Sequence, residues 1–194
     1  MSDYRFCPLC ATPLAMLERE EDGGLKSRLR CPACEWTHWN NPTPVLAAVI
    51  EKVDEGGQIL LARNAAWPGR VFALITGFME AGETAEEGIA REVFEETSLR
   101  AESVKLIGVY DFQRMNQVIV AFHVVARGAV VLSPELLEYK LFPPEAVRCW
   151  PAGTGYALAD WLTARGYTPQ WRELAARAPQ PARSSAGPDT VKDS

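Results

Sequence analysis

Apolar, partly β-branched runs separated by turn residues occupy much of the chain and predict a sheet. The run from Val45 to Val53 is followed by the turn Glu55-Gly56-Gly57 and then by Gln58 to Arg63, an order that predicts a β-hairpin. Further segments are predicted as strands or parts of strands: Val71 to Thr76, Ser103 to Phe112, Gln117 to Ala126 and Leu141-Phe142.

Helical spacing interrupts this pattern in the middle of the chain and returns near its end. Thr84 and Glu87 have the spacing of a capping box, so a helix should begin there. Gly155 to Arg165 and Pro169 to Ala178 also have helical spacing. Strands on both sides of the central helix predict a protein of mixed α and β structure. The arc of that helix expected to face the core consists of Ile89, Ala90, Val93, Phe94 and Thr97.

Composition and charge narrow the class of protein. The 194 residues, 47% of them hydrophobic, suffice for one core with a small appendage. A net charge of −5 argues against nucleic acid held by bulk electrostatics. No apolar run approaches the roughly 20 residues that span a bilayer, and neither end resembles an export signal. We expect a cytoplasmic protein without a membrane partner, and a homodimer stays open.

Breaks in the pattern divide the chain into three parts. Asn40-Asn41-Pro42-Thr43-Pro44 separates residues 1–40 from a main domain of residues 41–178. From Pro179 onward, Pro, Ala, Ser, Gly and charged residues predominate, which predicts a disordered tail over residues 179–194.

Two C-x2-C pairs in the first part suggest a metal site. Twenty residues separate the pairs, a spacing typical of a zinc ribbon in which four thiolates bind one Zn²⁺. Disulfides and a redox pair are the alternatives, disfavoured by a reducing cytosol and by the lack of a nearby βαβ pattern. The segment Glu20 to Gly24 predicts a hairpin turn between the pairs. The expected ligands are Cys7, Cys10, Cys31 and Cys34.

Three other residues resemble possible ligands or nucleophiles. His38 follows the second pair and could replace one thiolate, although four thiolates are already available. His123 lies in a predicted strand and is interpreted as a sheet residue. Cys149 is left over, and we expect it to be buried in the core.

The central helix carries an unusual cluster of like charges. Glu92, Glu95 and Glu96 share one arc, and like charges three and four residues apart repel one another on a helix. A divalent cation would offset this repulsion, because Mg²⁺ takes carboxylate oxygens together with water and substrate phosphates. Arg91, four residues before Glu95, can orient that side chain. The alternative is a solvated acidic face.

The segment from Gly77 to Leu99 resembles the Nudix box, G-x5-E-x7-R-E-U-x-E-E-x-G-U. Ser98 replaces the last glycine of the box, which bears on the exit from the helix more than on a metal site. The resemblance implies an α/β/α sandwich that hydrolyses a pyrophosphate linkage with Mg²⁺ or Mn²⁺. The matching positions are Gly77, Glu83, Arg91, Glu92, Glu95, Glu96 and Leu99.

The expected chemistry assigns a role to each residue of the box. An anionic pyrophosphate beside three carboxylates requires cations between them, which neutralise the phosphates and activate a water molecule. Glu83 is a weaker ligand or a support for the ligands, Arg91 orients them, and the Gly77 carbonyl is an extra ligand. The general base is sought outside the box at Glu135 or Glu138, either of which is alternatively a surface charge. The metal ligands implied by the resemblance are Glu92, Glu95 and Glu96.

Two groups of zinc-ribbon Nudix enzymes compete as models for the substrate. Ala73 to Phe78 resembles NADH pyrophosphatases, but their S-Q-P-W-P-F-P-x-S motif is missing. Met115-Asn116-Gln117-Val118 and Glu138 to Phe142 are instead similar to proteins related to plant FAD and ADP-ribose pyrophosphatases. Asn116 and Gln117 either bond a base or ribose or merely open a strand. An FAD or ADP-ribose type substrate is predicted, with NADH as the alternative.

Two further functions stay open. A Nudix-fold sensor would bind a nucleotide without cleaving it, but the acidic positions of the box are all intact here, which favours an enzyme. The same metal site would also serve to remove oxidised nucleoside triphosphates.

Overall fold

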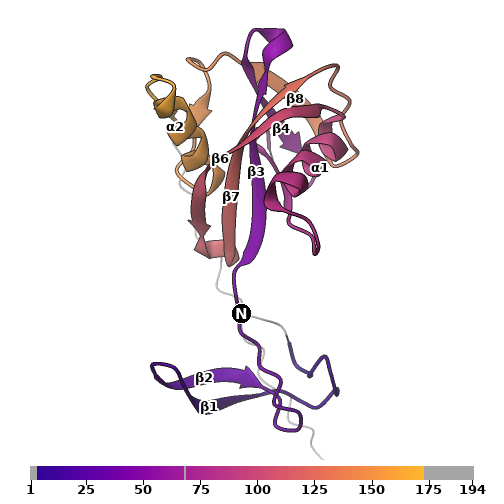
Figure 1. The fold of residues 1–194 in the computed structure, drawn as a ribbon, viewed down its shortest axis with the longest axis vertical. Coiled ribbons are helices and arrows are strands. Elements are labelled where there is room, and N and C mark those ends of the chain that lie inside the picture. Colours follow the sequence, from indigo (N-terminus) through magenta and orange to yellow (C-terminus); the bar gives the residue numbers. More distant parts are fainter. Residues whose placement is uncertain (1–3, 68, 173–194) are drawn as a thin grey trace, which may run out of the picture.

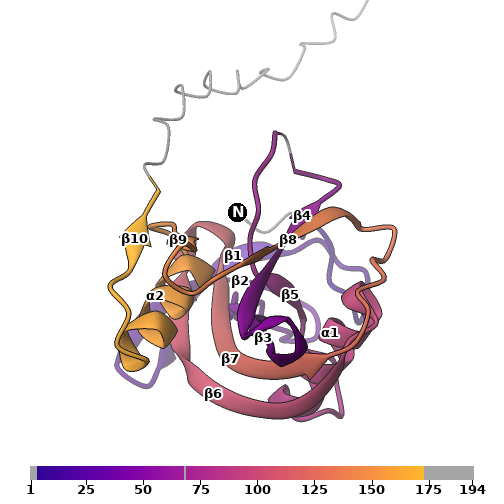
Figure 2. The ribbon, with the colours of Figure 1, turned by 90° about the horizontal axis from the view of Figure 1, so that it is seen from above.

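A computed structural model gives the fold, and the structure describes residues 4–67 and 69–172 (Figure 1). A two-stranded sheet at the N-terminal end is separate from a six-stranded mixed sheet that carries one helix on each face (Figures 1 and 2). Within the described ranges, no helix has the length and apolar character to cross a membrane.

The small sheet is a hairpin of strands β1 (Ala15–Glu21) and β2 (Gly24–Arg30). Its antiparallel register runs from Ala15 opposite Arg30 to Glu21 opposite Gly24. Asp22 and Gly23 form the turn, and Gly23 and Gly24 have φ of 88° and 105°, a backbone conformation that favours glycine. The hairpin turn expected at Glu20 to Gly24 is therefore present.

Strand β3 (Thr43–Lys52) is the centre of the large sheet. It pairs in parallel with β7 (Gln117–Arg127) along its full length. On its other side, Ile50 to Lys52 pair with β4 (Gln58–Asn64), while Val45 to Ala48 pair with β5 (Ile75–Phe78). The predicted hairpin of β3 and β4 is thus confirmed, but only near its turn, because β5 takes the rest of that edge.

The remaining strands extend the large sheet in both directions. Strand β6 (Arg100–Phe112) pairs with β7, and β8 (Leu136–Phe142) pairs with β4. Short 3-10 helices follow β3 and β6, namely η1 (Val53–Glu55) and η2 (Gln113–Met115). A separate parallel pair consists of β9 (Arg148–Cys149) and β10 (Gln170–Trp171).

Alternate residues of β3 face the two helices, as the two-residue period of a strand requires. Leu46, Ala48 and Ile50 lie in the core beneath α1 (Ala85–Thr97). Val49 lies in the core beneath α2 (Thr154–Ala164), on the opposite face. Burial of each large aliphatic side chain contributes about 1.5–3 kcal/mol. These two cores make the molecule an α/β/α sandwich, which confirms the predicted fold.

Helix α1 has well-formed ends. The Thr84 hydroxyl accepts the Glu87 N–H at 3.2 Å, and the Glu87 carboxylate accepts the Thr84 N–H at 2.8 Å, which completes the predicted capping box. At the other end Ser98 has φ of 58°, a left-handed conformation that usually belongs to glycine, and its N–H donates to the Phe94 carbonyl. The helix therefore ends at the expected place without the glycine of the box.

Three predictions of local structure need correction. Phe94 is 47% exposed rather than in the core, and the Arg100 guanidinium covers its ring at 5.4 Å. The predicted strand Val71 to Thr76 is displaced to Ile75–Phe78, because pairing with β3 defines it. The helix predicted from Pro169 is wrong where it is described, since Gln170 and Trp171 pair with β9. The rest of that helix and the predicted tail lie outside the described residues.

Candidate active site

Gly77 lies at the point where β5 brings the chain against α1. A Cβ atom built on Gly77 would lie 1.8 Å from Cδ of Glu92, far inside van der Waals contact. Only a glycine allows the Glu92 carboxylate to approach the backbone of β5 this closely. The first residue of the box therefore has a steric role toward its central acidic cluster.

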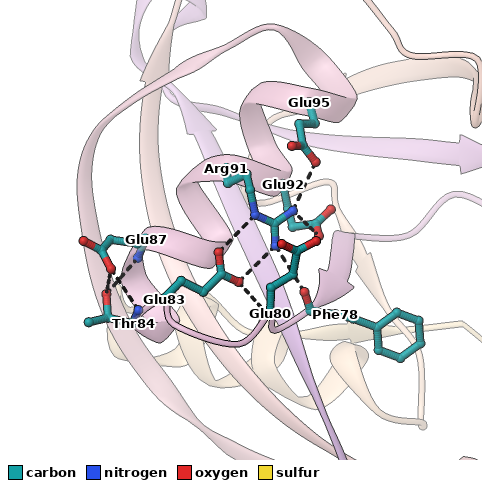
Figure 3. Close-up of polar contacts among 8 residues, drawn as sticks. All are labelled: Phe78, Glu80, Glu83, Thr84, Glu87, Arg91, Glu92 and Glu95. Carbon is teal, nitrogen blue, oxygen red and sulfur yellow. Dashed lines mark hydrogen bonds and ion pairs between the residues drawn. The ribbon is translucent and has the colours of Figure 1, made fainter.

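Arg91 joins the carboxylates of the box to the loop before the helix (Figure 3). Its Nε and Nη2 donate to the two oxygens of Glu83, each at 3.0 Å. Its Nη1 donates to Glu92 at 2.8 Å and to Glu95 at 3.1 Å, and Nη2 also donates to the Phe78 carbonyl. Hydrogen bonds from Arg91 lower the pKa of Glu83, which keeps that carboxylate ionised. Arg91 thus fixes the relative positions of three acidic side chains.

The carboxylates on α1 differ in their surroundings. The Glu95 side chain is 56% exposed, whereas Glu96 is buried. Burial, followed by the charges of Glu92, Glu135 and Glu95, raises the pKa of Glu96 to about 7. Burial also raises the pKa of Glu92, against the opposing effect of Arg91. In the described ranges no group donates a hydrogen bond to the Glu96 carboxylate. Glu96 is therefore a buried acid whose charged neighbours are other acids.

This donor set fits a hard divalent cation, which takes carboxylate oxygens. Glu92 lies against the Gly77 backbone, and the charges of Glu92 and Glu95 both act on Glu96. Their oxygens do not all lie within 4.8 Å of one another, because Arg91 draws Glu92 and Glu95 toward itself.

A cavity of about 1310 Å³ opens beside α1. One side, which we call the acidic wall, comes from α1, its preceding loop and the turn before β8. Residues from β6, η2, β7 and the segment between β9 and α2 line it elsewhere. The carboxylates of the acidic wall are Glu80, Glu92, Glu95, Glu96 and Glu135.

The two candidates for the general base lie in different places. Glu135 lines the cavity, and its charge contributes to the raised pKa of Glu96. Glu138 does not line the cavity and forms ion pairs with Arg63 and Arg70, each at 3.3 Å. Burial tends to raise the pKa of Glu138, but Arg70 and then Arg63 outweigh it and lower that pKa. Glu135 is therefore better placed than Glu138.

The two residues expected to bind the nucleotide also differ in their position relative to the cavity. Gln117 lines the cavity, but Asn116 does not. The Asn116 side-chain amide donates to Asn40 Oδ1 at 3.2 Å and to the carbonyls of Asn40 and Asn41 at 3.4 Å each. Its backbone carbonyl accepts the Thr43 N–H at 2.9 Å. Asn116 therefore holds the segment that leads from the small sheet into β3.

Most residues of the cavity were not predicted as site residues from the sequence, among them Arg114, Trp150 and Arg172. Arg114 follows β6, Trp150 follows β9, and Arg172 follows β10. No motif connects them in the sequence, and the sheet order alone brings them to one cavity.

The four expected cysteines cluster as the ribbon requires. All four Sγ atoms lie within 4.8 Å of one another, and the pairs Cys7–Cys34 and Cys10–Cys31 are 3.5 Å apart. Thiolates on a tetrahedral zinc would be about 3.8 Å apart, given Zn–S bonds of about 2.3 Å. All are free thiols, so the disulfide alternative is wrong here. The N–H groups of Leu9 and Ala33 donate to Cys7 and Cys31, as suits thiolate ligands.

The other residues singled out in the sequence have structural surroundings. The His38 ring lies against Tyr4 and Trp36, outside the cysteine cluster. His123 lies in β7 with its Nε2 2.7 Å from Glu51, as expected of a sheet residue. Cys149 is fully buried, and burial raises its pKa to about 11, which confirms packing rather than nucleophilic chemistry.

Known proteins share sequence with this chain. The model of the NUDIX domain matches residues 42–162. The NAD-capped RNA hydrolase NudC of Pseudomonas putida is 28% identical over 167 residues, which are 84% of this chain and 57% of the relative. The chain therefore spans less than two thirds of that relative's length.

Solved structures share the fold. A NUDIX hydrolase from Nitrosomonas europaea has a TM-score of 0.69 and 27% identity, and the match covers 87% of this chain and 97% of the other. A protein described as a possible asymmetric diadenosine tetraphosphate hydrolase, from Jonesia denitrificans, shares the fold at 22% identity, with a TM-score of 0.55 and coverage of 66% and 98%. Because the domain model matches more than half of its residues, the chain belongs to the Nudix family.

Proposed function

We propose that this protein hydrolyses the pyrophosphate linkage of a nucleoside diphosphate derivative in the presence of a divalent cation. The observation that carries the proposal is the acidic wall, where Glu92, Glu95 and Glu96 border a cavity of about 1310 Å³. Such a volume suits a dinucleotide, since pockets for smaller ligands are about 300–1,000 Å³.

Each residue of the box has a role in this proposal. Glu92, Glu95 and Glu96 hold Mg²⁺ or Mn²⁺, with Glu83 and the Gly77 carbonyl as further candidates. When bound, the cations neutralise the phosphates and lower the pKa of a coordinated water. Arg91 keeps Glu83, Glu92 and Glu95 in position through the contacts described above. Glu135 accepts the proton of the attacking water, because it lies on the acidic wall without an arginine partner in the described ranges.

The substrate is proposed to be of the FAD or ADP-ribose type. Gln117, in the segment similar to that group of proteins, lines the cavity and is available to a base or ribose. Asn116 supports the segment before β3 instead. An NAD-type dinucleotide is the second candidate, because several relatives carry the name NAD-capped RNA hydrolase NudC. A sensor without catalysis is disfavoured by the complete set of acidic residues.

The N-terminal cysteines are proposed to bind one structural Zn²⁺. Four thiols within 4.8 Å suit a closed tetrahedral site, and no described group competes for a coordination position. Free thiols at all five cysteines also support a reducing, cytoplasmic location.

One assay tests the proposed function. The full chain is incubated with Mg²⁺ and, in turn, FAD, ADP-ribose, NADH and nucleoside triphosphates, and products are separated by chromatography. We expect FAD or ADP-ribose to have the highest kcat/KM of these compounds. Its cleavage should yield a nucleoside monophosphate. If the protein cleaves none of these compounds, the proposal is contradicted. If it prefers NADH, only the substrate assignment is contradicted.

A further inference from the structure

The cavity has a second charged region beside its acidic wall. Arg114 and Arg172 line it together with the aromatic residues Phe112 and Trp150, and we call this set the arginine wall. The third arginine on the cavity, Arg91, is neutralised by three carboxylates. Neither Arg114 nor Arg172 forms an ion pair with any carboxylate in residues 4–67 and 69–172. The arginine wall therefore presents positive charge without a balancing acid.

Arg172 is held in place by neutral groups. Its Nη1 donates to the Phe72 carbonyl at 3.2 Å, and its guanidinium lies 5.6 Å from the centre of the Trp150 ring. Burial, and then the charge of Arg148, lower the pKa of Arg172. A partly buried cation whose charged neighbour is another cation is destabilised unless an anion reaches it. The remaining donors of Arg172 are thus available to an anionic ligand.

Arg114 has a similar arrangement on the neighbouring segment. It lies in η2 with its guanidinium 5.4 Å from the centre of the Phe112 ring. A ring behind a guanidinium restricts its orientation and leaves the N–H edge free, which is the edge that binds phosphate oxygens in pairs. Two arginines of this kind on one cavity are suited to a dianionic group.

The scissile diphosphate does not account for this charge. On the proposed function, the diphosphate lies against the cations of the acidic wall, which already neutralise it. The acidic wall comes from α1 and the turn before β8, whereas Trp150 comes from the segment leading to α2 on the opposite face of the sheet. A substrate with its diphosphate on the acidic wall would reach the arginine wall with its nucleoside.

We infer that Arg114 and Arg172 bind a phosphomonoester on the ribose of the substrate's nucleoside, separate from the diphosphate that is cleaved. This inference rests on the proposed hydrolysis of a pyrophosphate linkage. It extends the substrates beyond FAD and ADP-ribose, which carry no such phosphate, to nucleoside diphosphate derivatives with a 2′- or 3′-phosphate. The phosphodiester of an RNA chain has related oxygens, but the net charge of −5 disfavours a polyanion along the surface.

Pairs of substrates that differ by one phosphate test the inference by kinetics. The pairs are NADP⁺ with NAD⁺ and coenzyme A with dephospho-coenzyme A, each assayed with Mg²⁺. We expect kcat/KM to be about tenfold higher for the phosphorylated member of at least one pair, mainly through KM, the size of one charge-assisted hydrogen bond. Arg172→Gln and Arg114→Gln should remove this preference by raising KM for the phosphorylated member. Arg172→Lys should keep part of it.

Arg100→Gln is the matched control. Arg100 also lies over an aromatic ring, that of Phe94 at 5.4 Å, and forms no ion pair with another described residue, but it does not line the cavity. This variant should keep the wild-type preference. Equal kcat/KM within both pairs, or a preference that survives both glutamine variants, would overturn the inference. A preference for NAD-capped RNA over NADP⁺ would assign the arginines to an RNA chain and overturn it as well.

A binding measurement separates this inference from the proposed function. Adenosine 2′,5′- and 3′,5′-bisphosphate and AMP are titrated into the full chain by calorimetry without added Mg²⁺. One bisphosphate should bind about tenfold more tightly than AMP, and Arg172→Gln should abolish the difference. This result without hydrolysis of any diphosphate would support the arginine wall and reject the enzyme. Hydrolysis of a diphosphate together with equal binding of all three ligands would support the enzyme and reject the arginine wall as a phosphate site.

Discussion

The Glu92 carboxylate occupies the space that any side chain at position 77 would need, since a Cβ there would lie 1.8 Å from Glu92 Cδ. Gly77→Ala should therefore push Glu92 out of position and lower kcat by at least about tenfold, as for displacement of a metal ligand. It should also destabilise the fold by about 1–3 kcal/mol through overpacking. Kinetics and urea unfolding measure both effects.

The double variant Gly77→Ala, Glu92→Ala supplies the control for that prediction. Removing the Glu92 side chain relieves the clash, so stability should recover while activity stays low. Wild-type kcat in Gly77→Ala alone would show that the close approach is not needed for hydrolysis.

Glu95→Gln with Glu96→Gln should reduce hydrolysis by at least about tenfold and weaken its dependence on Mg²⁺. Each change removes a negative charge while preserving shape, and cations need those charges. The measurement is kcat against Mg²⁺ concentration. Glu86→Gln, an exposed position on the same helix, is the control and should behave as the wild type. Undiminished turnover by the double variant would remove both residues from the metal site.

Metal analysis of the purified protein should find about one zinc per chain. Cys7→Ser with Cys10→Ser should release it, because two of the four thiolates are lost. Cys149→Ala should keep the zinc, since Cys149 is buried in the core away from the cluster. Protein without zinc, with all four clustered thiols open to alkylation, would contradict the assignment.

Ser98→Gly should stabilise the protein. Ser98 ends α1 with φ of 58°, and a left-handed conformation costs a non-glycine residue about 1–2 kcal/mol. Thermal unfolding should show a Tm higher by a few degrees, about 2–4 °C per kcal/mol for a chain of this size. Ser103→Gly, in the extended strand β6, should lower Tm instead. A Tm unchanged or lowered by Ser98→Gly would mean that the serine hydroxyl offsets the strain.

Gln117→Ala should raise KM for the preferred substrate by the equivalent of about 1–3 kcal/mol, with kcat changed less, because its amide lines the cavity. Asn116→Ala should leave KM nearly unchanged and lower Tm, because that amide binds Asn40 and Asn41. Steady-state kinetics of the two variants distinguish the neighbours. A raised KM in Asn116→Ala, with KM unchanged in Gln117→Ala, would assign Asn116 to the nucleotide site.

The parts predicted correctly from the sequence depend on short-range relations. The capping box of Thr84 and Glu87 is a contact across three residues, and the acidic arc of α1 follows from helical period alone. The two cysteine pairs likewise indicate their cluster by spacing. Each of these features is present where the sequence places it.

The errors arise where distant segments compete. Gln170 has helical neighbours in the sequence, but pairing with Arg148 makes it a strand. Asn116 is separated from Asn40 by 76 residues, so its hydrogen bond left no local signal. Phe94 shares an arc with Val93, yet the sheet covers only part of that arc. For the same reason Arg114 and Arg172 could not be connected from the sequence.

The alternation of β3 has a consequence for how this site can diversify. Replacing Ala48 acts on the side of the sheet that supports α1 and the acidic wall. Replacing Ala47 acts on the side that supports Ala157 of α2, close to the cavity residues Gly153 and Thr154. Neighbouring residues of one strand therefore support different sides of the cavity, one the acidic wall and the other the segment that leads into α2. A substitution at one of these two positions should therefore alter one side of the site and leave the packing of the other side unchanged.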